Sequence, residues 1–123
     1  MRLYRVFPRL ESADSRQPGH PMYVPPMQGR GRVDNPEHYR VLYASDAPIG
    51  AIAEAFRNHA VWTVDLFRSP ALPDASLALA TYDARRASFL DLDDAQTLLD
   101  RELRPSDVVT RDRDRTQRWS LAV

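Results

Sequence analysis

The most regular pattern of apolar and polar positions lies between residues 39 and 58. Tyr39–Ala44 is rich in aromatic and β-branched residues, which is typical of a buried strand. Ser45–Pro48 follows, with two polar side chains suited to capping a helix and a proline suited to its first turn. Apolar residues then recur at spacings of three and four to about Asn58, which predicts an amphipathic helix. The apolar face of this helix is expected to comprise Ile49, Ile52, Ala53 and Phe56.

Three other segments have patterns that favour strands. Leu3–Phe7 alternates apolar residues with arginine, and Pro8 is expected to end it. Ser76–Tyr82 is ambiguous between helix and strand, and we favour a strand because acidic residues stand close to both of its ends. Ser88–Leu92 has the composition of another short strand.

The C-terminal third of the sequence predicts helices. Asp93 can cap a short helix from Asp94 to about Leu103, which Pro105 is expected to close. The charged residues 111–115 alternate in sign and are expected to be solvated, and Thr116–Val123 then has an apolar, helix-like pattern. This pattern reaches Val123 without a C-cap, so we expect the domain to lack a C-terminal segment.

A long stretch from Pro8 to Gly31 has few signals of regular structure. Such stretches in small domains are often binding loops. It leads into Gly29–Pro36, whose glycines and Asn-Pro pair indicate a turn. The Arg-Gly-Arg sequence at residues 30–32 is compatible with a nest for phosphate, although this signal is weak by itself.

Composition limits the class of protein. The chain of 123 residues fits a single domain, and its 17 basic and 17 acidic residues balance, which argues against direct nucleic acid binding. Every basic residue is an arginine, and the absence of cysteine excludes disulfides and thiolate chemistry. No apolar stretch reaches the length of a membrane span or a signal sequence. We therefore expect a soluble, cytoplasmic protein without a membrane partner.

The sequence contains few groups that could form a metal or acid–base site. The three histidines have no ligand spacing, so no metal site is expected. Asp93–Asp94 and Asp112–Asp114 are interpreted as caps and solvated charges. Three other residues remain candidates: Arg32 after the glycine turn, Tyr43 at the end of the predicted strand, and Glu54 on the following helix. Each one alone also suits an ordinary structural role.

Several short sequences occur together in an order that resembles the RES-domain family. The specific block comprises Gly31–Pro36, Val41–Ser45 and Ala53–Phe56, which resemble the family's glycine–arginine turn, strand end and glutamate-bearing helix. Tyr4–Phe7 and Thr116–Trp119 resemble further family landmarks near the two ends. This resemblance touches the whole chain.

The resemblance implies a fold and an activity. The fold would be α+β (mixed α/β), a compact domain similar to ADP-ribosyltransferase toxins, with short strands around a cleft and a few helices. The activity would be that of a toxin-type enzyme that consumes NAD as substrate, by phosphorolysis or hydrolysis, without a prosthetic group. Some members ADP-ribosylate a protein target instead. The implied protein partner is an Xre-type antitoxin.

The resemblance also gives roles to the three candidate residues. Arg32 would bind the pyrophosphate or a ribose hydroxyl of NAD with forked, charge-assisted hydrogen bonds. Tyr43 would contact and orient the nicotinamide ring. Glu54 would stabilise the positive charge that develops on the ribose.

One departure from the family pattern leaves alternatives open. The family's serine lies beyond the helix that contains Thr116–Trp119, and Ser120 does not match its position. The chain is therefore also compatible with a catalytically inactive, truncated RES domain that binds an antitoxin. Its apolar C-terminal end is compatible with a homo-oligomer. A third alternative is a small α+β domain whose motif matches are accidental.

Overall fold

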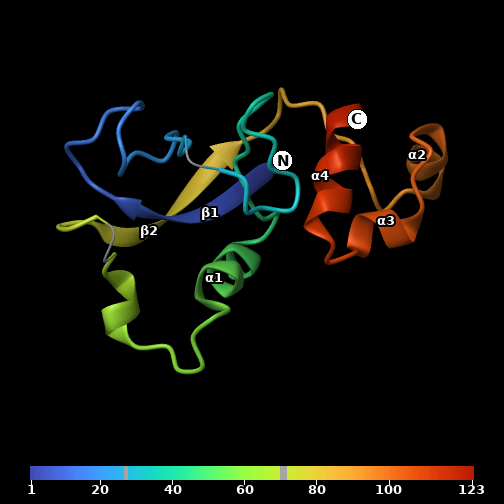
Figure 1. Ribbon diagram of the computed structural model, residues 1–123. Coiled ribbons are helices and arrows are strands. Elements are labelled where there is room, and N and C mark those ends of the chain that lie inside the picture. The colour runs from blue at the N-terminus through green and yellow to red at the C-terminus, as the bar shows by residue number, and fades with distance from the viewer. Residues whose placement is uncertain (27, 70–71) are drawn as a thin grey trace. The chain divides into compact units, whose positions relative to one another are not determined.

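The computed structural model describes residues 1–26, 28–69 and 72–123 and shows a mixed α+β protein (Figure 1). The predicted α+β class is confirmed. The chain forms two compact units, which are described separately: the first comprises Met1–Val24 and Leu42–Ala87, the second Pro25–Val41 and Ser88–Val123. In order, the elements are β1 (Arg2–Arg9), α1 (Pro48–Phe56), the 3-10 helix η1 (Val64–Phe67), β2 (Ser76–Asp83), α2 (Ala95–Asp100), α3 (Pro105–Val109) and α4 (Arg113–Ala122).

The first unit is built on the antiparallel pair β1–β2, in register from Arg2 opposite Asp83 to Arg9 opposite Ser76. Both strands were predicted, and both are slightly longer than expected. The prediction that Pro8 ends the first strand is wrong, because β1 continues through it. Tyr4 exchanges backbone hydrogen bonds of 2.7 and 2.8 Å with Ser45, on the side away from β2. Pro8 lies four residues further along the same strand, so its backbone nitrogen also points away from β2. The N–H that proline lacks would therefore not have bonded to β2.

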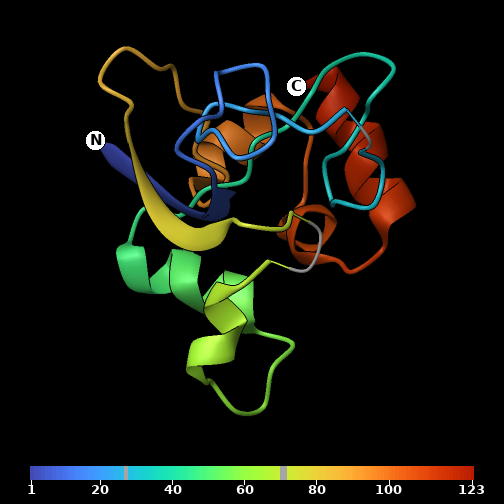
Figure 2. The same cartoon turned by 90° about the vertical axis from the view of Figure 1, so that its left-hand side faces the viewer.

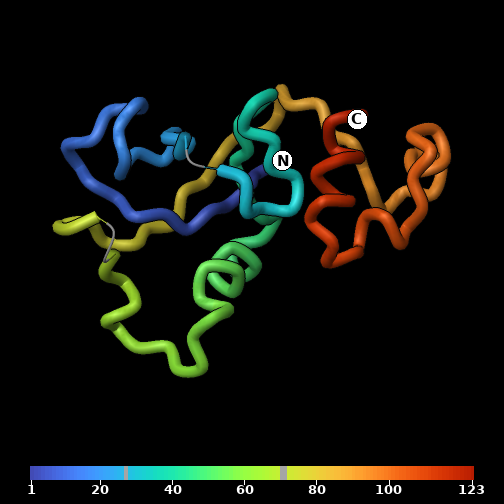
Figure 3. The backbone as a smooth tube through the Cα atoms, viewed as in Figure 1, coloured from blue at the N-terminus to red at the C-terminus, as the bar shows by residue number. Residues whose placement is uncertain are grey.

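The two faces of this sheet are covered differently. Helix α1 lies against one face, as Figures 1 and 2 show from two directions. The segment of residues 10–24 lies on the other side, visible in Figure 3 as the lighter blue tube that follows the dark blue β1. The Tyr82 hydroxyl donates to the Pro21 carbonyl at 2.5 Å, and the Arg5 guanidinium donates to the Tyr23 carbonyl at 3.5 Å. The first part of the predicted long loop is therefore tied to the sheet, with Phe7 and Ala80 buried beneath it.

Helix α1 confirms the helix predicted after residue 48, and it ends two residues earlier than expected. Pro48 occupies the first turn, and Ala51 and Phe56 are buried. Ala47 takes the N-cap position without a side-chain hydrogen bond, so neither of the predicted polar caps is used.

The buried strand predicted at Tyr39–Ala44 is wrong: this segment has no regular structure. The amide of Gln28 donates to the Val41 carbonyl at 2.8 Å and accepts from the Val41 N–H at 2.9 Å. One side chain therefore satisfies both backbone groups that a neighbouring strand would bind. The Tyr39 hydroxyl donates to the Val33 carbonyl at 2.8 Å. Tyr39 therefore makes a polar contact and does not form part of an apolar strand face.

The strand predicted at Ser88–Leu92 is also wrong. Phe89 is 55% exposed, and Asp91 accepts a hydrogen bond from the backbone N–H of Asp93 at 2.9 Å, which turns the chain. A short apolar run needs a neighbouring strand to form a ladder. None pairs with this segment among the described residues, and the aspartate turn takes its place.

The helices of the second unit differ from the prediction at their ends. Asp94, and not Asp93, caps α2 by accepting from the Thr97 N–H at 2.8 Å. Helix α2 ends at Asp100, before Glu102 takes a left-handed conformation with a φ of 57°. Pro105 begins α3 instead of closing α2, because proline suits the first turn of a helix.

Helix α4 begins at Arg113, three residues before the predicted start, because Asp112 caps it by accepting from the Arg115 N–H at 3.2 Å. Part of the predicted solvated stretch is therefore helical. The indole N–H of Trp119 donates to the Asp107 carbonyl at 3.0 Å, and Arg115 forms an ion pair with the Asp107 carboxylate. These contacts join α3 to α4 within the second unit.

The helices in the described part of the chain are all too short or too polar to span a membrane.

We expect Phe56→Ala to lower the free energy of unfolding by about 3 kcal/mol, the lower end for truncation of a buried phenylalanine. Phe56 is 6% exposed, and its ring lies 5.5 Å from that of Trp62 and 6.0 Å from that of Phe67. Urea unfolding followed by circular dichroism measures the change. Val64→Ala is the control, because Val64 is 81% exposed. Equal losses in the two variants would contradict this packing.

We expect Asp107→Asn to lower the melting temperature at pH 7 and to have less effect in acid. The Arg104 N–H, which donates to the Asp107 carboxylate at 2.9 Å, is the first cause that lowers the pKa of this group, and the Arg115 and Arg104 charges lower it further. A lowered folded pKa gives stability that is present above the unfolded value of about 4 and is lost as the pH falls through the folded pKa.

Thermal unfolding of wild type and Asp107→Asn at pH 7 and pH 3, at constant ionic strength, tests this pH dependence. The exposed Glu37 supplies the control variant Glu37→Gln. A difference between wild type and Asp107→Asn that stays constant with pH would contradict the assigned cause.

Candidate functional site

The loop that carries Arg32 is closed by the chain's own carboxylate. Asp34 is 6% exposed, and its Oδ2 accepts from the N–H of Gly29 at 2.9 Å and from the N–H of Gly31 at 2.8 Å. Backbone amides that converge in this way form a nest for an anion. Here Asp34 fills the nest, so the alternative of a phosphate bound by these two amides does not fit the structure.

Helix α4 holds the other side of this loop, and Figure 2 shows the cyan loop alongside the red helix. Gln117 Nε2 donates to the carbonyls of Gly29 at 3.0 Å and Gly31 at 2.8 Å. The hydroxyl of the fully buried Thr116 donates to the Arg32 carbonyl. The main chain on both sides of Arg32 is therefore bound to side chains of α4.

The side chain of Arg32 is exposed, and one of its terminal nitrogens is engaged. Nη2 donates to the carbonyls of Val108 and Thr110, the latter at 3.1 Å, at the end of α3. The guanidinium has five N–H donors. Its Nε and Nη1 have no hydrogen-bond partner among the described residues. The group is thus oriented at one nitrogen and open to an anionic ligand at the others.

Tyr43 lies in the irregular segment before α1, in the first unit, and is 48% exposed. The sequence predicted it at the end of a buried strand, which is wrong. The residue is instead accessible to solvent over about half its surface, which suits contact with a ligand.

Glu54 lies on the exposed side of α1, opposite the buried Ala51 and Phe56. Its carboxylate forms an ion pair of 2.7 Å with Arg57, and the two side chains are 66% and 64% exposed. A pair this exposed contributes little to stability, so it leaves the carboxylate available. Glu54 and Tyr43 belong to the first unit and Arg32 to the second, and each is described within its own unit.

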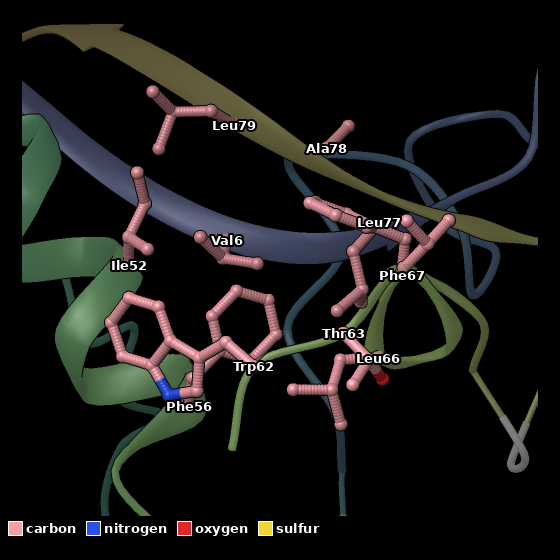
Figure 4. A pocket seen from close by; sticks show the side chains of 11 residues that line it. Val6, Ile52, Phe56, Trp62, Thr63, Leu66, Phe67, Leu77, Ala78 and Leu79 are labelled. Carbon is pink, nitrogen blue, oxygen red and sulfur yellow. The ribbon is translucent and has the colours of Figure 1, made fainter. Parts of the chain in front are cut away.

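An apolar cavity of about 430 Å³ in the first unit was not predicted. It lies between β1–β2, α1 and η1, and Figure 4 shows the side chains of Trp62 and Phe56 directed into it from one side and Leu79 from another. It contains no ionisable side chain, so it cannot supply acid–base chemistry. The aromatic residues at 56, 62 and 67 are a sequence signal that could have indicated it. The lining consists of Val6, Ile52, Phe56, Trp62, Thr63, Val64, Leu66, Phe67, Leu77, Ala78 and Leu79.

In residues 1–26, 28–69 and 72–123, no group of three or more histidine, aspartate or glutamate side chains is arranged to hold a metal ion.

Comparisons with known proteins give one match. A family model described as RES domain matches residues 2–123, which is nearly the whole chain. Searches of curated proteins and of solved structures found no match. The family match confirms the resemblance inferred from the glycine–arginine turn and the helix with Glu54. The chain therefore belongs to the RES domain family.

Proposed function

We propose that this protein consumes NAD by cleaving the bond between nicotinamide and ribose, as a toxin-type enzyme. Membership of the RES domain family makes NAD the expected substrate. The observation that carries the proposal is the state of Arg32: its main chain is fixed, one nitrogen is oriented, and its other N–H donors face no partner among the described residues. A forked guanidinium in this state suits the pyrophosphate of a dinucleotide.

The proposed reaction transfers ADP-ribose to phosphate or water. The bond between ribose C1′ and the nicotinamide nitrogen breaks, and its electron pair stays with the nicotinamide, which leaves as a neutral molecule. An oxygen of phosphate or water forms the new bond to C1′, and with water a proton passes to solvent. Positive charge builds on the ribose before the new bond is complete, and a carboxylate beside it lowers the barrier.

We also propose roles for two residues of the first unit, each argued within that unit. The exposed Glu54 carboxylate would stabilise the ribose charge, exchanging its weak contact with Arg57 for the substrate. The ring of the half-exposed Tyr43 would contact nicotinamide, and its hydroxyl would orient it. NAD is the substrate in this proposal, and the chemistry needs no prosthetic group.

We expect the purified chain to release nicotinamide from NAD, and Glu54→Gln to reduce kcat by roughly 100-fold or more, because the lost charge acts mainly in the transition state. Arg32→Ala is expected to raise KM. Tyr43→Phe keeps the ring but removes the hydroxyl that would orient nicotinamide, so it is expected to reduce turnover. Chromatographic measurement of nicotinamide gives the rates. A requirement for phosphate in the buffer would indicate phosphorolysis, and its absence hydrolysis.

Glu37→Gln serves as the control, because it removes an exposed carboxylate from another part of the chain. Unchanged turnover in all three site variants would refute the assigned roles. Nicotinamide release that is absent from folded wild-type protein would refute the enzymatic proposal. ADP-ribose found covalently on a protein in the assay would instead indicate transfer to a protein target.

A second candidate function is partner binding without catalysis, with an Xre-type antitoxin as the proposed partner. The apolar cavity favours this candidate, because three of its lining side chains are largely exposed: Trp62 at 54%, Val64 at 81% and Phe67 at 50%. Exposed apolar residues grouped around a hollow are typical of protein interaction sites.

We expect Val64→Glu to weaken co-purification with a co-expressed neighbouring gene product by about tenfold or more, because it would place a charge in a desolvated contact. The melting temperature should change little, since Val64 is exposed. Leu99→Glu, at another largely exposed apolar residue, is the control. Equal co-purification of both variants would argue against this surface as the contact.

A further inference from the structure

Helix α4 makes an unusual set of contacts with the loop that carries Arg32. Thr116 is fully buried, yet it directs its hydroxyl to the Arg32 carbonyl. Gln117 donates to the carbonyls of Gly29 and Gly31, at 3.0 and 2.8 Å. Three carbonyls at and before Arg32 are thus bound by two adjacent residues of one helix.

The loop is also tied to α4 on its other side. Asn35 Nδ2 lies 2.9 Å from the Gln117 carbonyl and 2.9 Å from the Ser120 hydroxyl oxygen. The guanidinium of Arg32 meets the carbonyl of Thr110, which precedes α4. The residue is therefore fixed at its main chain by the helix and at its side chain by the segment leading into the helix.

We propose that Thr116 and Gln117 are positioning residues for anion recognition by Arg32. They hold the main chain so that the Nε and Nη1 edge of the guanidinium has one orientation before any ligand binds. A group that is oriented in advance binds its ligand more tightly, because less conformational freedom is lost on binding. This inference rests on the proposed function, and the anionic group concerned is the pyrophosphate of NAD.

The test compares Thr116→Val with Thr116→Ser. Valine keeps the shape of threonine and removes the donor, whereas serine keeps the hydroxyl. We expect Thr116→Val to raise KM for NAD by about tenfold, as for the loss of one buried hydrogen bond, with kcat within about twofold. Thr116→Ser should restore KM to near the wild-type value.

Hydrogen exchange gives a readout that does not depend on turnover. The amides of Gly29 and Gly31 donate to Asp34 in the closed loop, and we expect them to exchange about tenfold faster in Thr116→Val than in wild type. Arg118→Ala is the control on the same helix, because Arg118 is exposed. It should change neither loop exchange nor KM.

Gln117→Ala is the second variant, in case Thr116→Val does not fold. It removes contacts that are partly exposed, and it should also speed loop exchange and raise KM.

A lower melting temperature with unchanged KM would show a merely structural role and overturn the inference. Unchanged loop exchange in an active variant would also overturn it. Absence of NAD turnover in folded wild-type protein would instead overturn the proposed function, and the role of the positioning residues in NAD binding with it.

Discussion

The second unit depends on hydrogen bonds from side chains to main-chain carbonyls. Helix α4 is mostly polar, and the side chain that it buries completely is a threonine whose hydroxyl binds the Arg32 carbonyl. A loop without a ladder must find other partners for its backbone groups, and buried carbonyls left unpaired would cost the fold a large free energy. Thr116 and Gln117 supply those partners, so the same bonds hold the helix and shape the loop.

The first unit is stabilised differently, by apolar packing on both faces of a two-stranded sheet. Phe7 and Ala80 are buried on one face, while Phe56 packs with two other aromatic rings on the α1 side. Two strands alone are marginally stable in water, so each face needs a covering layer. The layer formed by residues 10–24 is bound by hydrogen bonds, whereas the α1 side retains an apolar cavity with an exposed rim.

Periodicity in the sequence was sufficient to predict β1 and α1, because each has one face against an apolar layer. For β2 it left helix and strand open, and the acidic residues near both ends of the segment favoured the strand. It failed for Tyr39–Ala44, since the composition of a strand says nothing of whether a partner strand exists. The amide of Gln28 binds both backbone groups of Val41, and no pattern around Val41 indicates this contact. The turn at Ser88–Leu92 has the same explanation, with Asp91 providing the competing hydrogen bond.

The candidate site could be predicted only as residue types in an order that resembles a family. What the structure adds about Arg32 is its set of partners, which are carbonyls 76 and 78 residues further along the chain, and so no local pattern could reveal them. The structure also shows that the loop's glycine amides bind Asp34.

A phosphate can be bound by backbone amides or by a cationic side chain. Because Asp34 occupies the amides, an anion at this loop would depend on arginine side chains, and Arg32 is one whose guanidinium is already oriented at one nitrogen. A lysine could carry the charge, but it could not bind the α3 carbonyls through one nitrogen while presenting further donors in the same plane. Arginine at position 32 therefore suits both the observed contacts with the Val108 and Thr110 carbonyls and the proposed contact with NAD.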